Sequence, residues 1–438
     1  EITFYKNGTV QNSGTPFTLG GTLVTAYSVL PFFSGFDYDS PSQQEFEAQS
    51  NFGQDSSFAG AVTAQGNTDS NDQGDFYYEP PTDFLALCTS NLSDPEIKLP
   101  GDNFNTVLYT GDGTSPRSIT GVGFQPDLVW GKARDDTWGH KWQDVVRGSE
   151  NTIWSNNTNA EDDYYIWGYL SAFDSDGFTI TAGASGSQGW NDSTDTFVAW
   201  NWLGGGAGSS NTDGTITSTV SANTTAGFSI ATYTGNNTDQ ATIGHGLSQI
   251  PDLTIIKDRD NASTQWVINP YGAYQSNYYG YFTDGTFTAD TSNVFFYDST
   301  ASVVKLSNHA EVNASSTDYV MYNFHSVEGY SKIGKYTGNF NVDGAFIYTG
   351  FKPAFVMVKR ISGVNNWVMT DSERSPYNAI YGRLWADLDN AEATDSVDSD
   401  FVSNGFKLRV ANNASNPSDS PMLYIAFAES PFKYANAR

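Results

Sequence analysis

One segment of this sequence recurs three times, and its recurrence limits the possible folds more than any other feature. Each copy contains a proline, a short apolar run and a lysine six residues after the proline. The prolines and lysines are, in chain order, Pro126, Lys132, Pro251, Lys257, Pro353 and Lys359. Proline has a fixed φ and no N–H donor, so it suits the first residue of a strand, and the apolar run fills the interior of a sandwich. The sequence therefore predicts one buried strand written three times.

Other short motifs recur in the same order around each copy of this segment. A Tyr-Thr-Gly triplet precedes each copy, at residues 109–111, 233–235 and 336–338. Each copy also ends on a strand with alternating aromatic residues, at residues 196–202, 318–324 and 422–428. Between them, Asp176-Gly177 and Asn404-Gly405 are pairs that favour positive φ and indicate hairpin turns. The shared order predicts three tandem domains of about 100 residues each.

Composition favours an all-β protein and excludes some partners. Aromatic residues make up 15% of the chain and there are 42 glycines, which is typical of strands joined by wide turns. The net charge of −28 disfavours nucleic acid and anionic membrane surfaces, because phosphate binding depends on clustered cations. The sequence contains no stretch of eighteen apolar residues, so no membrane span is predicted. Cys88 is the single cysteine, so no intrachain disulfide is expected.

Metal and cofactor sites are not predicted. The four histidines are scattered without the spacing of a zinc site, and the interpretation of them as core or loop residues is preferred. No complete calcium loop and no Gly-x-Ser-x-Gly nucleophile elbow appears. We expect no catalytic residue, no metal and no cofactor, although so many carboxylates leave a glycosidase pair open as an alternative.

The first sixty residues differ from the repeats. A strand at residues 2–6 is followed by an Asn-Gly turn and a return strand, and residues 51–53 read Asn-Phe-Gly. These motifs resemble the C-terminal half of a SPRY-type, concanavalin-like sandwich, whose partner half would precede Glu1. The resemblance implies open sheet edges that another chain or segment must cover.

The predicted fold is thus all-β, with three antiparallel, jelly-roll-like β-sandwich repeats following a partial lectin-like sandwich, in an elongated chain. The boundaries are the partial sandwich at 1–62, an ordered connector at 63–101, repeat 1 at 102–203, a flexible Gly/Ser-rich linker at 204–225, repeat 2 at 226–327 and repeat 3 at 328–438.

The whole pattern, ending in Pro-Phe-Lys-Tyr-Ala-Asn-Ala-Arg at residues 431–438, resembles a virion protein of marine tailed phages. That family carries a lectin-like N-terminal region and repeats of an uncharacterised β-domain. The resemblance implies a non-enzymatic structural or adhesive part of the particle, exposed at the virion surface as a tail fibre or appendage. It transfers no catalytic residue. A capsid-decorating or assembly protein and a polysaccharide depolymerase are the alternatives.

Two groups of residues are candidates for binding host-surface polysaccharide. Aromatic faces beside amides and carboxylates suit sugar rings, and ordinary β packing or a subunit interface is the alternative that we prefer. The candidates are Tyr271, Tyr274, Tyr278, Tyr279 and Tyr281 in repeat 2, and Trp190 with Asn191 in repeat 1.

The three recurrent lysines allow two interpretations. The preferred one is a structural pair with a carboxylate at the end of the buried strand, and the other is a site for an anionic glycan. Homo-oligomerisation and contacts with other virion proteins are expected, because repeated modules and unpaired edges favour symmetric contacts.

Overall fold

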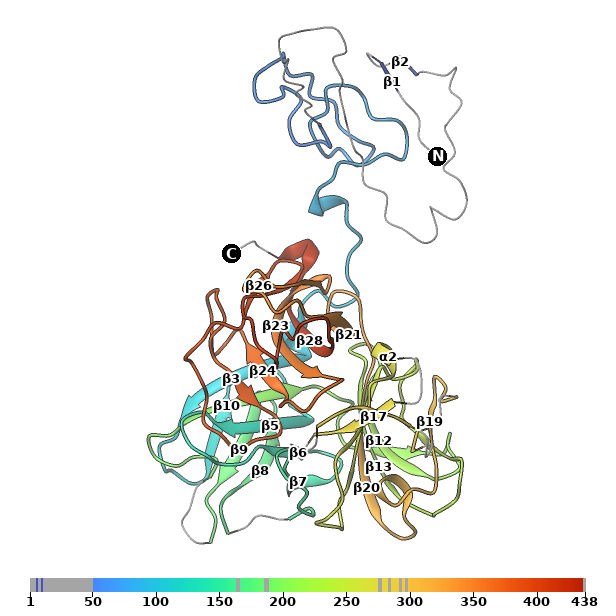
Figure 1. Ribbon diagram of the computed structural model, residues 1–438, viewed down its shortest axis with the longest axis vertical. Helices are drawn as coiled ribbons and strands as arrows, with labels where there is room; N and C mark the ends of the chain where they lie inside the picture. Colours follow the sequence, from blue (N-terminus) through green and yellow to red (C-terminus); the bar gives the residue numbers. More distant parts are fainter. Residues whose placement is uncertain are drawn as a thin grey trace. The chain divides into compact units, whose positions relative to one another are not determined.

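The computed structural model describes residues 5–6, 9–10, 50–162, 166–184, 189–274, 278–282, 285–290, 294–295 and 298–435 (Figure 1). The predicted fold class is confirmed: the described residues form antiparallel sheets stacked as sandwiches, with only short helical turns between them. The chain divides into two compact units, residues 1–93 and residues 94–438.

The described residues of the first unit contain little regular structure. Its hairpin pairs β1 (Tyr5–Lys6) with β2 (Thr9–Val10), as the Asn-Gly turn predicted. Much of the predicted partial sandwich at 1–62 lies outside the described residues. From residue 50 onward, the unit is held by side chains that bind the backbone. Asp69, for example, accepts bonds from the amides of Asn71, Gln73 and Ala86.

The predicted connector at 63–101 divides between the two units. Residues up to Ser93 belong to the first unit, which contains the short 3-10 turn η2 (Thr89–Asn91). The remainder leads through a second turn, η3 (Pro100–Asp102), into the first strand of the second unit.

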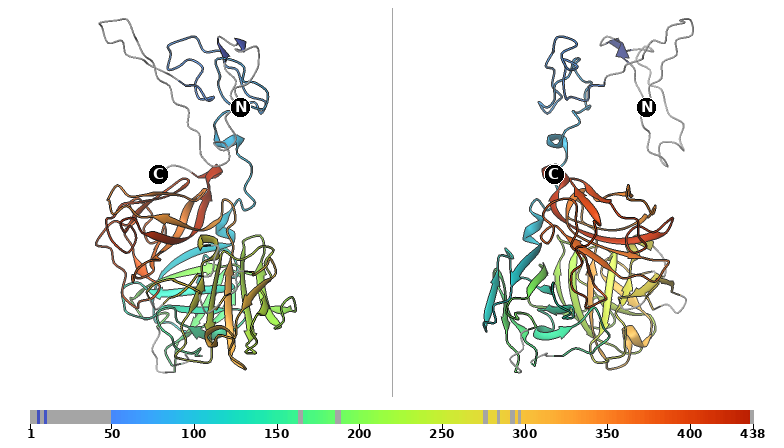
Figure 2. Two further views of the ribbon diagram at one scale, coloured as in Figure 1. Left: turned by 45° about the vertical axis from the view of Figure 1, so that its right-hand side comes forward. Right: turned by 60° about the vertical axis from the view of Figure 1, so that its left-hand side comes forward.

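Three lobes make up the second unit (Figures 1 and 2). Lobe 1 is residues 102–203, lobe 2 is residues 204–327 and lobe 3 is residues 328–435. Lobe 1 has an inner sheet of five strands: β3 (Phe104–Thr110), β10 (Thr196–Trp202), β5 (Leu128–Ala133), β6 (Lys141–Asp144) and β7 (Gly148–Ile153). Its outer sheet has three strands: β4 (Arg117–Thr120), β9 (Gly177–Thr181) and β8 (Tyr169–Asp174).

Lobe 3 repeats this arrangement strand for strand. Its inner sheet consists of β21 (Ser331–Thr337), β28 (Pro421–Pro431), β23 (Phe351–Arg360), β24 (Val368–Asp371) and β25 (Leu384–Trp385). Its outer sheet consists of β22 (Phe346–Tyr348), β27 (Gly405–Leu408) and β26 (Ser399–Val402), and the lobe ends in the turn η4 (Phe432–Tyr434). In both lobes the first, eighth, third, fourth and fifth strands lie side by side in that order.

Lobe 2 has the same five-stranded core within a wider sheet. The core consists of β13 (Phe228–Thr234), β20 (Asp318–Phe324), β15 (Leu253–Asp258), β16 (Val267–Asn269) and β17 (Tyr278–Tyr281). The sheet is extended at its two ends by β11 (Ser209–Asn211), β12 (Ser218–Asn223) and β18 (Thr288–Ala289). The outer sheet pairs β14 (Ala241–Gly244) with β19 (Val303–Leu306), and two one-turn helices follow strands, α2 (Tyr271–Tyr274) and α3 (Ala310–Asn313).

The prediction of a flexible linker at 204–225 is wrong. This segment contains β11 and β12, which pair with each other and with β13. Its glycines are needed for close approach: a Cβ on Gly205 would lie 2.6 Å from the Ala222 carbonyl oxygen. The amides of Gly204 and Gly206 both donate to the Asp127 carboxylate, at 2.7 and 3.0 Å. Glycine here permits tight packing and does not provide a free hinge.

The three lobes share one hydrophobic core, so the predicted elongated arrangement of the repeats is also wrong. The shared core, called the central core below, takes side chains from the inner sheet of every lobe. Tryptophans provide much of it, and they include Trp130, Trp142, Trp200, Trp202, Trp266 and Trp367. The Trp130 and Trp142 rings lie 4.4 Å apart between centroids, and Trp142 lies 5.3 Å from Trp266 of lobe 2. Each lobe also has its own smaller core between its inner and outer sheets.

Strand alternation explains how one sheet serves two cores. In β10, Val198, Trp200 and Trp202 face the central core, while Ala199 faces the interior of lobe 1. Since successive side chains point to opposite faces, a strand covered on both sides must be apolar at nearly every position. This accounts for the continuous apolar runs after Pro126 and Pro251.

The prolines take two different places. Pro126 and Pro251 lie two residues before β5 and β15, close to the predicted strand start. Pro353 lies inside β23, where the register with β28 shifts on both sides of it. A proline has no N–H for the ladder, so it is tolerated inside a strand at such a bulge. The hairpins at Asp176-Gly177 and Asn404-Gly405 are formed as predicted.

Candidate functional site

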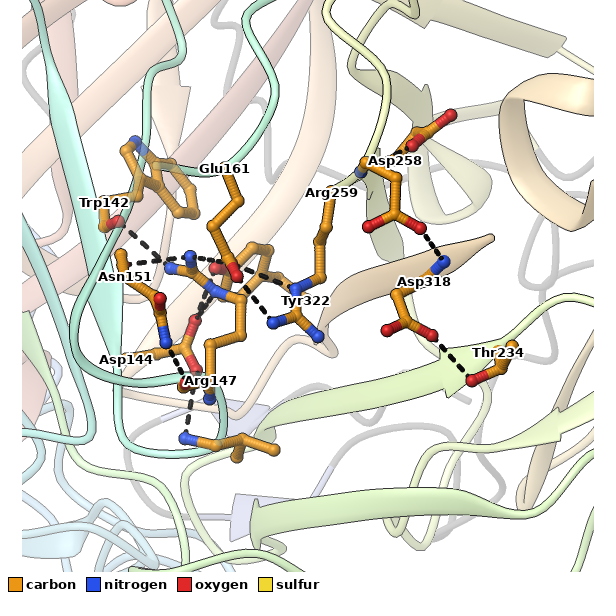
Figure 3. A network of polar contacts seen from close by, with 12 residues as sticks. Trp142, Asp144, Arg147, Asn151, Glu161, Thr234, Asp258, Arg259, Asp318 and Tyr322 are labelled. Carbon is orange, nitrogen blue, oxygen red and sulfur yellow. Dashed lines mark hydrogen bonds and ion pairs between the residues drawn. The ribbon is translucent and has the colours of Figure 1, made fainter. Parts of the chain in front are cut away.

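A buried polar network lies where lobe 1 meets lobe 2, and we call this contact seam 1–2 (Figure 3). Arg147 stands at its centre, with a fully buried side chain. Its Nε donates to Asp144 at 2.6 Å, and one terminal nitrogen donates to Glu161 at 2.8 Å. The other terminal nitrogen donates to the Trp142 carbonyl oxygen at 3.0 Å. The nitrogen bound to Glu161 also donates to the Asn151 carbonyl oxygen at 3.1 Å. The guanidinium thus binds two carboxylates and two backbone carbonyl oxygens.

Lobe 2 completes the network from the other side. The Nη2 of Arg259, at the end of β15, donates to Glu161 at 2.6 Å, and the Glu161 amide donates to the Arg259 carbonyl oxygen at 2.7 Å. The Tyr322 hydroxyl donates to the Asp144 carboxylate at 2.7 Å. Two residues of lobe 2 therefore satisfy carboxylates of lobe 1, and each carboxylate is shared between the lobes.

The same constellation occurs between lobe 3 and lobe 1, at seam 1–3. Arg374 donates to Asp371 at 2.6 Å and to Glu392 at 3.0 Å, and Arg134 of lobe 1 donates to Glu392 at 2.7 Å. Trp200 takes the place of Tyr322, and its indole N–H donates to Asp371 at 3.0 Å. The two seams are related residue by residue, as the shared strand order requires.

Among the described residues, the third contact, seam 2–3, has no buried Asp–Arg pair like those of the other two seams. The register of β15 with β16 places Pro270 and Ala273 where lobe 1 has Asp144 and Arg147. Rings fill the space, with Phe282 and Trp367 5.2 Å apart between centroids. Ile361 stands where the other two lobes have Arg134 and Arg259, because the amides of all three donate to the equivalent residue of the closing strand. Its neighbour Arg360 donates to Ser420 at 3.2 Å, and the buried Nε of Arg360 has no hydrogen-bond partner among the described residues.

Backbone contacts close the ring of three lobes. The Trp266 indole of lobe 2 donates to the Trp154 carbonyl oxygen of lobe 1 at 2.8 Å. The Trp367 indole of lobe 3 makes the corresponding bond to Tyr281 of lobe 2 at 3.3 Å. Ser155 of lobe 1 donates to Ala386 of lobe 3 at 2.6 Å. Each lobe thus binds both of its neighbours.

Burial and charge set the pKa values in seam 1–2. Burial by itself would raise the pKa of Glu161, but hydrogen bonds and charges of Arg259 and Arg147 hold it below its usual value. Burial would lower the pKa of Arg147, yet the nearby carboxylates raise it. Both groups are therefore held in their charged forms, and the seam is a set of permanent ion pairs.

The recurrent lysines are buried, with exposed fractions of 2% for Lys132, 0% for Lys257 and 1% for Lys359. Backbone carbonyl oxygens accept their hydrogen bonds, in place of the predicted carboxylate. Lys132 donates to Ala133 at 2.5 Å and Asp136 at 2.8 Å, and Lys257 donates to Asp258 at 2.7 Å.

Lys359 reaches across seam 2–3 to the Gly285 carbonyl oxygen, at 2.7 Å. Burial lowers the pKa of Lys132 and of Lys257 to about 8 in each case. None of the three lysines faces solvent as a glycan site would require.

The tyrosine cluster does not form one surface. Tyr274 and Tyr278 pack against the central core, whereas Tyr279 and Tyr281 pack against the interior of lobe 2. The hydroxyl of Tyr281 donates to Glu311 at 2.9 Å. All four, and Tyr271 at the start of α2, are half-buried. The cluster is divided between two faces of β17 and α2, so packing accounts for these residues.

Trp190 and Asn191 are also interior residues, exposed to 2% and 3%. The Asn191 side chain binds Asp112, Thr114 and Arg117, so it closes the turn that follows β3. Trp190 packs inside lobe 1 with Phe178, at 6.0 Å between centroids. Neither side chain presents a face to a sugar, which corrects the prediction that this pair is a glycan contact.

Sequence reasoning missed the seams, although a signal was present. Asp144 and Asp371 each lie eighteen residues after the motif proline of their repeat, and each is followed three residues later by an arginine. An Asp-x-x-Arg pair occurs at one offset in two repeats, and Asn269 and Gly272 occupy that offset in the remaining repeat. This recurrence indicates a shared structural role for the pair.

Among the described residues, no group of three or more His, Cys, Asp or Glu side chains is placed to hold a metal ion. No helix within those same ranges is long and apolar enough to cross a membrane.

The family match fits the closed ring of lobes. Residues 99–431 match one family model, described as a domain of unknown function, DUF7483. The chain belongs to this family. One family domain thus covers all three lobes, in agreement with a single compact unit at 94–438. Comparisons with curated proteins and with solved structures found no match.

Proposed function

We propose that this chain is a non-catalytic structural component of a phage particle, exposed at the virion surface, where it contacts host glycans. One observation carries the structural part of the proposal: the buried charges of seams 1–2 and 1–3 bind one lobe to the next. Across seam 1–2, Glu161 binds Arg259 and Asp144 binds Tyr322. Across seam 1–3, Glu392 binds Arg134 and Asp371 binds Trp200. The resemblance of the sequence to marine phage virion proteins supports the particle as the setting.

Glu161 of seam 1–2 is a poor candidate for a catalytic acid. A glycosidase needs one carboxylic acid with a raised pKa in an apolar pocket beside a second carboxylate. Glu161 has a lowered pKa because two arginines bind it. This electrostatic arrangement favours a structural role over a depolymerase, and reducing-sugar release from host envelopes is expected to equal the buffer blank.

Gold-labelled antibody against residues 94–438, imaged on purified particles, tests the proposal. Labelling of tails or appendages is the expected result. Labelling of the capsid face alone would support the decorating alternative, and absence of the protein from purified particles would refute the virion assignment. Light scattering on the purified chain tests the proposed homo-oligomer, which predicts a mass that is a multiple of 47.7 kDa.

A further inference from the structure

The first unit contains a hollow lined largely by aromatic rings and prolines. Its volume is about 660 Å³, within the range of roughly 300–1,000 Å³ typical of ligand sites. The rings that line it include Phe52, Phe58, Phe76, Tyr77, Tyr78 and Phe84. Three of them are well exposed for aromatic residues: Phe52 at 53%, Tyr78 at 50% and Phe84 at 67%.

The wall of the hollow is held in place by local hydrogen bonds. The Asn51 side chain donates to the carbonyl oxygens of Asp55 and Asp75 and accepts from the Gly53 amide. The Tyr77 and Tyr78 rings pack edge to face at 4.8 Å between centroids. Ring faces fixed by such contacts lose little entropy when a ligand binds, which favours recognition of a flat apolar surface.

Charge limits what the hollow accepts. Residues 50–93 contain six acidic residues and no Lys or Arg: Asp55, Asp69, Asp72, Asp75, Glu79 and Asp83. Glu79 lines the hollow itself, beside the hydroxyl-bearing Tyr78 and Thr82. Along residues 50–93 an anionic ligand would find no Lys or Arg, whereas a carboxylate and hydroxyls provide acceptors and donors for sugar hydroxyls or amines.

We infer that this hollow binds a segment of polysaccharide that carries no acidic groups. The apolar faces of its sugar rings stack on the exposed aromatic rings, and its hydroxyl or amino groups bind Glu79 and Thr82. This assignment names the ligand class for the proposed function. It rests on that function only in taking the host surface as the source of the glycan. It also moves the sugar contact away from the tyrosines of lobe 2.

Three soluble oligosaccharide panels test the inference with the full chain: neutral, amino-substituted and uronic-acid-containing. Calorimetry is expected to detect binding of a neutral or an amino-substituted oligosaccharide and none of the acidic ones. Tyr78→Ala and Phe84→Ala should each weaken that binding about two- to tenfold, given the usual strength of ring contacts. Tyr78→Phe keeps the ring and should bind within twofold of the wild type.

Glu79→Gln distinguishes the two accepted classes. This substitution should lower the affinity for an amino-substituted oligosaccharide at least tenfold and leave the affinity for a neutral one within about threefold of the wild type, because only the amine carries a charge. Tyr377→Ala is the matched control, since Tyr377 is 78% exposed in the second unit.

Three outcomes would overturn the inference: no non-acidic oligosaccharide binds, the acidic ones bind best, or both alanine variants bind like the wild type. The measurement uses purified protein, so its failure is separate from a failure of the virion assignment.

Discussion

Removing the central arginine of seam 1–2 should cost far more stability than removing an exposed cation. The change Arg147→Met keeps most of the side-chain volume and removes the charge. It leaves Asp144, whose side chain is fully buried, without its cation, and leaves Glu161 with Arg259 alone. Breaking a buried pair from one side typically costs about 3–5 kcal/mol, because the other charge stays desolvated.

Urea unfolding followed by tryptophan fluorescence measures this loss. All eleven tryptophans lie between residues 130 and 385, so the signal reports on the second unit alone. The same substitution at Arg374 should cost a similar amount, since its carboxylate partners and geometry match. Lys98→Met removes an exposed partner of Asp94 and should leave the midpoint unchanged. A loss below about 1 kcal/mol for Arg147→Met would refute the view that this network fixes the lobes.

Three further predictions follow from burial and packing. Burial lowers the pKa values of Lys132 and Lys257 to about 8, so between about pH 8 and their usual 10.5 the unfolded chain binds more protons than the folded chain. Stability should therefore rise with pH in this range. The substitution Lys257→Met should flatten part of this rise, which is measured as the urea midpoint at a series of pH values. Above about pH 10.5 stability should fall, because burial raises the pKa of Tyr424 from its usual 10.0 to about 12, so the folded chain binds more protons there. Trp190→Ala should cost about 3–5 kcal/mol of unfolding free energy without changing glycan affinity, and unchanged stability would contradict its interior place. Limited proteolysis should cut near the boundary at Ser93 and spare 204–225, and cleavage first within 204–225 would contradict the ordered strands.

The sequence was a good guide to strands and a poor guide to their assembly. The motif proline, the closing aromatic strands and the Gly177 hairpin are local signals, and each predicted its element. The central core has no such signal. A strand buried between two sheets and a strand buried between a sheet and a neighbouring lobe have the same apolar run, so Trp200 and Trp202 could not reveal which surface they face.

Two errors at the candidate sites have simple physical causes. Glycines at 204–206 suggest flexibility by composition, yet Gly204 and Gly205 are there because a Cβ would collide with Ser221 or Ala222. Tyrosines suit sugar contacts and β packing equally well, and only the alternation along β17 separates Tyr279 from Tyr278. The aromatic hollow of the first unit was missed because its rings come from separated turns with no period.

Small-angle scattering of residues 94–438 tests most directly whether the three lobes form a closed body. A compact unit of this length should have a radius of gyration of about 20 Å. Three independent domains in a row, each with a radius near 13 Å, would give roughly 30 Å. A value near 20 Å is predicted by the shared core and the paired seams, and a value near 30 Å would contradict them.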